Sequence, residues 1–155
     1  MGLNEDLEIL RQTPVFSDME AEAVRLIAFG AEHITIKPGG TLYEQDEKAD
    51  CAYVVVSGKM EMWTQFEDNK PKFHGFLDRA ALLGEMALIS QSNRQFTVKA
   101  VGEAVVLKIN REAFHRLIGE YPYIADILKR RFESNLAKLS QGLTSVGQDI
   151  TSIGQ

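Results

Sequence analysis

Two charged side chains stand in an otherwise largely apolar stretch, LLGEMALISQSNRQFTV at residues 82–98. Glu85 directly follows Gly84, and Arg94 lies nine residues further along the chain. The residues 84–88 are typical of a tight turn that leads into one helical turn, whose first N–H groups lack backbone partners and suit a phosphate. A guanidinium can reach the same phosphate with forked donors, in a charge-assisted contact worth about 1.5–3 kcal/mol.

A carboxylate beside that phosphate needs a different partner. Because Glu85 would be repelled by the phosphate, a neutral donor such as a sugar hydroxyl suits it better. Gly84 would let a ligand approach the backbone closely. The stretch can therefore bind a phosphate together with a ribose. The alternative is that Glu85 and Arg94 pair with each other, and the residue types alone do not decide between the two interpretations.

Other chemistries find little support in the residues. His33, His74 and His115 stand singly, without the clustered His or Cys ligands of a metal site, so we expect surface or structural histidines and no metal. Neither a Gly-x-Ser-x-Gly motif nor a Gly-Lys-Ser/Thr loop occurs. Cys51, the single cysteine, begins an apolar run and is expected to pack there. No catalytic set emerges, and we do not expect an enzyme.

Composition limits the partners and the compartment. The 155 residues suffice for one domain with an appendage, and the net charge of −5 disfavours binding to nucleic acid. Lys129, Arg130 and Arg131 are adjacent, and we interpret them as a solvated helix face. No apolar run approaches the length of about 18 residues that a membrane span needs. With one cysteine and an acidic start, the sequence predicts a cytoplasmic chain.

The middle of the chain has the sequence pattern of β-strands, and helices are predicted on either side of it. A helix is predicted at residues 3–12, and a second helix follows the capping-box spacing of Ser17 and Glu20. From 31 to 109, short alternating runs are separated by turn residues about every ten positions, which favours a sandwich or barrel. The runs on either side of Gly102 and Glu103 are predicted to form a hairpin.

Two helices are predicted after the strands. Asn110 is a plausible cap for a helix over 111–118 that Gly119 ends, and a longer helix begins near Pro122. In the C-terminal region apolar residues alternate steps of four and three, as in a heptad seam: Phe132, Leu136, Leu139, Leu143, Val146, Ile150 and Ile153. We divide the chain into a domain at 1–139 and a tail at 140–155, which forms either an oligomeric coiled coil or a polar tail.

The stretch at 84–97 resembles the phosphate-binding cassette of the cyclic nucleotide-binding domain family. That family includes catabolite-activator-type regulators, regulatory subunits of the cAMP-dependent kinase and nucleotide-gated channels. Its cassette reads Gly-Glu, two small or apolar residues and Leu, then a loop and Pro-Arg-x-Ala-Thr. Here the matching residues are GEMAL at 84–88 and NRQFT at 93–97. The resemblance covers roughly residues 7–139 and implies a mainly β fold, an antiparallel β-roll (jelly roll, double-stranded β-helix) with flanking N- and C-terminal helices.

The resemblance also implies a role for each matching residue. Arg94 would bind the cyclic phosphate with the amides of Ala87 and Gln95, and Glu85 with Gly84 would bind the ribose 2′-hydroxyl. The base would lie toward the long C-terminal helix, which acts as a lid in the family. The residues assigned to the base and lid are Phe96, Thr97, Leu128, Arg131 and Phe132.

Departures from the family pattern bear on the ligand. Asn93 replaces the usual Pro, Asp46 and Ala49 replace two glycines, and Gln95 stands where some cGMP-preferring members carry a hydroxyl. Phe96 replaces the usual Ala and brings about 150–250 Å² of surface to bury. Its ring could pack in the roll, form a wall for the base or fill the pocket.

Two functions follow from these residues. The first is a regulatory module that binds a cyclic nucleotide, cAMP rather than cGMP, and relays occupancy through the C-terminal helix. The alternative is a ligand-free relic of such a domain that serves as a scaffold for oligomerisation or protein interaction.

Overall fold

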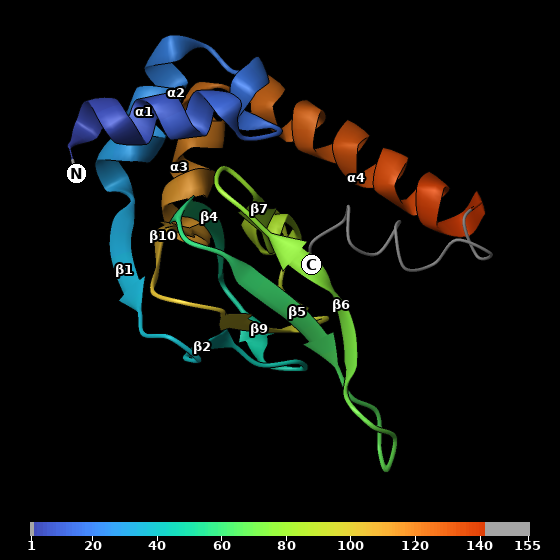
Figure 1. Ribbon diagram of the computed structural model, residues 1–155. Helices are drawn as coiled ribbons and strands as arrows, with labels where there is room; N and C mark the ends of the chain where they lie inside the picture. Colours follow the sequence, from blue (N-terminus) through green and yellow to red (C-terminus); the bar gives the residue numbers. More distant parts are fainter. Residues whose placement is uncertain (1, 142–155) are drawn as a thin grey trace.

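The computed structural model describes residues 2–141, so most of the predicted tail lies outside the described residues. Helices gather at one end of a β-roll, and α4 runs on past the roll at its C-terminal end (Figure 1). The helical elements are α1 (Leu3–Gln12), η1 (Phe16–Asp18), α2 (Ala21–Gly30), η2 (Glu85–Leu88), α3 (Arg111–Glu120) and α4 (Tyr123–Gln141).

The helix ends differ from two details of the sequence prediction. Ser17 lies within η1, and α2 begins after Glu20 without a side-chain cap, so the predicted capping box is wrong. α3 continues through Gly119 to Glu120 and ends before Pro122, because a residue that precedes proline is disfavoured in the helical conformation.

The strands form two four-stranded antiparallel sheets and one short pair, which confirms the predicted antiparallel β-roll. One sheet has the order β1-β10-β4-β7 and the other β2-β9-β5-β6, while β3 pairs with β8. The strands are β1 (Glu32–Ile36), β2 (Thr41–Tyr43), β3 (Lys48–Ala49), β4 (Cys51–Ser57), β5 (Met60–Thr64), β6 (Lys72–Leu77), β7 (Leu82–Leu83), β8 (Ser92–Asn93), β9 (Thr97–Ala100) and β10 (Ala104–Asn110).

The predicted hairpin around Gly102 is wrong. β9 pairs with β2 and β5, whereas β10 pairs with β1 and β4 in the other sheet. The N–H of Val101 donates to the carbonyl of Lys59 at 3.0 Å. The turn between β9 and β10 is therefore bonded to a distant segment of the chain. Local alternation indicates that two runs are strands, but it does not say which partners they take.

β4 separates two hydrophobic cores. Ala52, Val54 and Val56 face the core under the helices, while Tyr53 and Val55 face the interior of the roll. Burial on both faces explains why this strand is a continuous apolar run in the sequence. Cys51 is buried in the core of the roll, as predicted.

A β-bulge interrupts the pairing of β5 with β6. Met62 is opposite Gly75 and Trp63 is opposite Phe73, so the register skips His74, which is the extra residue of the bulge. The bulge leaves Phe73 and Phe76 both exposed, while the ring of His74 lies edge-on to Phe96 with 5.1 Å between centroids. A bulge of this kind changes the direction of one side chain without ending the strand.

Candidate functional site

The predicted tight turn at residues 84–88 is present, and it leads into one helical turn. Gly84 has a left-handed backbone (φ 73°) and leads directly into the single turn of η2. A side chain at position 84 would clash with Nη1 of Arg94, so the glycine is required for the close approach of that guanidinium. The turn and Arg94 are therefore packed against each other.

Arg94 is buried beneath this turn. Its Nη2 donates to the carbonyl of Cys51 at 2.9 Å, and its guanidinium carbon lies 4.2 Å from the ring centre of Tyr43. Its Nε and Nη1 are buried and have no hydrogen-bond partner among the described residues. A buried cation with unused donors is costly unless an anion meets it, because burial removes the solvation of the charge.

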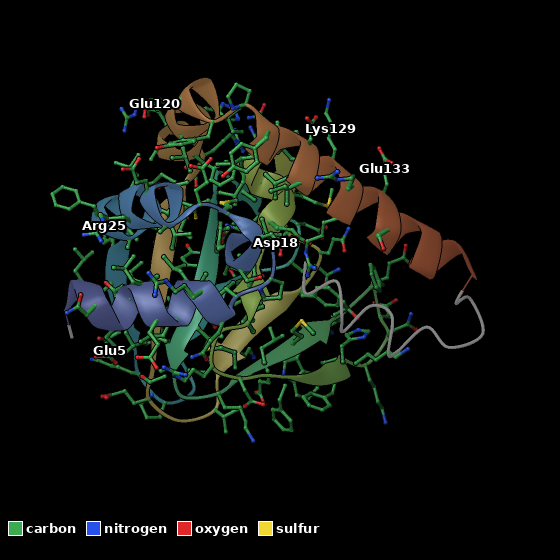
Figure 2. The ribbon with its side chains drawn as sticks, turned by 90° about the horizontal axis from the view of Figure 1, so that it is seen from above. Glu5, Asp18, Arg25, Glu120, Lys129 and Glu133 are labelled. Carbon is green, nitrogen blue, oxygen red and sulfur yellow. The ribbon has the colours of Figure 1, made fainter. Side chains whose placement is uncertain are left out.

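Glu85 does not pair with Arg94, which excludes that interpretation of the sequence. Its side chain is 6% exposed, and Oε2 accepts a hydrogen bond from Nε of Arg131 on α4 at 2.8 Å. The prediction of a fully solvated basic face is thus wrong for Arg131, which is 31% exposed. Lys129 on the same helix points away from the body of the molecule (Figure 2).

A cavity of about 660 Å³ opens at the end of the roll beside Arg94. It lies between the base of the β5–β6 hairpin, the turn after β2 and the segment around Arg94. Its lining residues include Gln45, Thr64, Phe66, Lys72, His74, Asn93, Arg94, Gln95 and Phe96. The cavity thus combines cations, apolar rings and uncharged polar groups, as ligand sites do.

Thr64 and His74 form a hydrogen-bonded pair in the wall of this cavity. Thr64 Oγ1 and His74 Nε2 are 2.6 Å apart. Burial, together with the charge of Lys72, lowers the pKa of His74 below its ordinary value of 6.5, which favours the neutral imidazole near neutral pH. Sequence reasoning missed both residues. The inward positions of Met60 and Met62 could have indicated Thr64, but the bulge that turns His74 has no clear signal in the sequence.

Comparison with known proteins identifies the architecture. The family model of the cyclic nucleotide-binding domain matches residues 33–121, more than half of the chain. The chain belongs to this family. A cyclic nucleotide-binding-like protein from Brucella abortus is 34% identical, over 74% of this chain and 98% of that one, with a TM-score of 0.68. Domains of this family are regulatory modules.

More distant relatives match at lower identity. The regulatory domain of Toxoplasma gondii PKA, solved with cAMP, is 20% identical over 89% of this chain and 51% of that chain, with a TM-score of 0.73. Rat patatin-like phospholipase domain-containing protein 7 is 29% identical over 77% of this chain. The chain spans only 9% of the length of that first curated relative.

The cyclic nucleotide-binding domain places its predicted phosphate and ribose residues around one turn. Gly84, Glu85 and Ala87 lie on or next to η2, and Arg94 is packed against Gly84. The carbonyl of Ala87 accepts a hydrogen bond from Nε of Arg111 at 2.6 Å, and Nη2 of Arg111 donates to the carbonyl of Ala49. Arg111, which the sequence did not single out, thus fixes η2 to β3 from the start of α3.

The predicted base and lid residues are dispersed. Phe96 is 2% exposed, packs in the core of the roll and also lines the cavity. Thr97 accepts a hydrogen bond from the N–H of Gln45 at 2.9 Å and so holds the turn after β2. Leu128 is buried in the core under the helices, Arg131 contacts Glu85, and the side chain of Phe132 lies outside the described residues.

No group of three or more His, Cys, Asp or Glu side chains in the described part of the chain is arranged to hold a metal ion. Within residues 2–141, no helix has both the length and the apolar character needed to cross a membrane.

Proposed function

We propose that this domain binds a cyclic nucleotide, cAMP in preference to cGMP, and passes its occupancy to α4. Arg94 would bind the cyclic phosphate together with the amides of Ala87 and Gln95. Glu85, next to Gly84, would accept a hydrogen bond from the ribose 2′-hydroxyl. The ligand class follows from the family, and the solved relative that contains cAMP supports the choice of nucleotide.

The observation that carries this proposal is the environment of Arg94. Arg94 is only 5% exposed, yet two of its nitrogens have no hydrogen-bond partner among the described residues. None of the ion pairs found in the described part of the chain involves it. A ligand phosphate would supply the missing negative charge and acceptors.

Glu85 supports a connection between the ligand and α4. An ionised carboxylate offers about four acceptor positions, so a ribose hydroxyl can join Arg131 at Glu85 without displacing it. Ligand binding would then change the charge and hydrogen bonding at the point where α4 contacts the turn. This is the physical basis for relaying occupancy through α4.

Isothermal calorimetry with cAMP and cGMP tests the proposal. We expect binding of both, tighter for cAMP, and a loss of about 10- to 150-fold in Arg94→Ala, the value of one charge-assisted contact. Arg25→Ala, at an exposed position on α2, is the matched control and should bind normally. Arg94→Lys retains the charge but not the forked donors, and should bind with intermediate affinity.

Two results would contradict the proposal. One is an equal loss of affinity in Arg94→Ala and Arg25→Ala. The other is the absence of heat with either nucleotide at high protein concentration, which would favour the ligand-free scaffold instead.

A further inference from the structure

The cavity that Arg94 lines also contains hydrogen-bonding groups to which the resemblance assigned no role. Thr64 is the last residue of β5 and is 8% exposed, and His74 is the bulged residue of β6. Both line the same cavity as Arg94. A nucleotide whose phosphate lies at Arg94 would therefore extend toward this pair with its other end.

The pair has a fixed geometry. The alternation of β5 directs Thr64 to the inner face with Met60 and Met62. The ring of His74 is held between its bond to Thr64 and its edge-on contact with Phe96, whose own ring is buried. Because both partners are positioned by strands and by packing, the hydroxyl of Thr64 presents a defined direction to the cavity.

The bond between the two side chains limits what Thr64 can offer. A hydroxyl has one donor and two acceptor positions, and a neutral imidazole has one of each. If the hydroxyl donates to Nε2 of His74, only acceptor positions of Thr64 Oγ1 remain. The exocyclic amino group of adenine is a donor and matches them, whereas guanine carries a carbonyl oxygen at the same position and would be repelled.

We propose that the base of the bound nucleotide is recognised by Thr64 and His74, with His74 holding the hydroxyl of Thr64 as an acceptor for the adenine amino group. Selectivity between nucleotides then resides in the wall of the roll and not in α4. This inference rests on the proposed function and specifies how the same site chooses its ligand.

The experiment compares dissociation constants for cAMP, cGMP and the cyclic 3′,5′-monophosphate of inosine, which carries a carbonyl oxygen in place of the adenine amino group. In Thr64→Val, we expect cAMP to bind about 2- to 13-fold more weakly, the value of one neutral hydrogen bond, with little change for the other two. In Thr64→Ser the hydroxyl remains, and the preference should remain too. Thr41→Val, at an exposed position on β2, is the matched control.

His74→Leu gives an independent readout. Without the imidazole, the hydroxyl of Thr64 can turn and donate, so binding of cGMP and of the inosine nucleotide should improve relative to cAMP. A merely structural role of His74 would instead weaken all three nucleotides by a similar factor, and that result would overturn the inference.

The outcomes separate this inference from the function on which it rests. Binding that depends on Arg94 but keeps its wild-type preference in Thr64→Val would overturn the inference and leave the proposed function intact. No binding of any of the three nucleotides to the wild-type chain would overturn both.

Discussion

Arg94 carries a positive charge into the interior of the roll, and its neighbours compensate for that charge only in part. The carbonyl of Cys51 accepts one hydrogen bond, and the ring of Tyr43 lies under the guanidinium at cation–π distance. Burial raises the pKa of Tyr43, so this phenol stays neutral and adds no counter-charge. Arg94 is thus held in place by neutral groups, which do not neutralise its charge.

Phe96 has a structural role as well as a place in the wall. Since its ring is 2% exposed in the core of the roll, we expect Phe96→Ala to lower the free energy of unfolding by about 3–5 kcal/mol. Phe66→Ala is a suitable control because Phe66 is 60% exposed, and its effect should stay within about 0.5 kcal/mol. Urea unfolding measures both. Equal stabilities of the two variants would contradict the placement of Phe96.

The site residues that the sequence indicated are fixed by local structure, whereas those that it did not indicate are fixed by distant contacts. Gly84, Glu85 and Arg94 lie close together in sequence or in a recognisable cassette, and the structure packs Arg94 against Gly84. Their roles toward a ligand stay predictions. His74 and Arg111 depend on strand register and on contacts across 24 or more residues, such as the bond from Arg111 to Ala87. Such contacts leave no local pattern.

At the scale of elements, α4 is connected to the turn at η2 by one ion pair in the described residues. Arg131 reaches from α4 to Glu85 across 46 positions of sequence. The Glu85 end of this pair is buried and the Arg131 end is partly exposed, so its contribution to holding α4 is modest, about 1 kcal/mol.

Arg131→Gln should therefore loosen α4 without unfolding the roll. We expect amide hydrogen exchange in α4 around Arg131, beyond the turns anchored by Ile124 and Leu128, to become about fivefold faster, since about 1 kcal/mol corresponds to that factor. The further change in exchange caused by cAMP should become smaller. Arg130→Gln is the matched control, because Arg130 is exposed on the same helix. Exchange that is equal in both variants would contradict a link through Arg131.

The kinds of elements were more predictable than their partners. Alternation identified the strands, and in β5 the more buried Met60 and Met62 alternate with Glu61 and Trp63. The prediction of a hairpin around Gly102 was wrong because the two adjoining strands belong to different sheets. Periodicity reports which face of a strand is buried, whereas pairing is decided by how the whole roll closes.

At the scale of the whole molecule, the two cores place the cavity and the helices on opposite sides of β4. Leu128 and Ile124 hold the start of α4 to the helical core, while Arg131 contacts the turn at the edge of the roll. In the proposed relay, a change at the turn would therefore act on α4 beyond its anchored first turns. What lies after α4 in the sequence is the segment in which the heptad pattern continues.

The tail is the last feature that the sequence predicts, and most of it lies outside the described residues. If the seam from Phe132 to Ile153 joins two or more chains, removal of residues 140–155 should convert an oligomer to a monomer in sedimentation equilibrium. Ile124 and Leu128 remain in the shortened chain, so the domain should still fold. Gly147→Ala should act in the opposite direction and stabilise the oligomer, because alanine favours a helix over glycine by about 1 kcal/mol per residue. An oligomeric mass that survives the deletion, or a full chain that is already monomeric, would end the coiled-coil hypothesis.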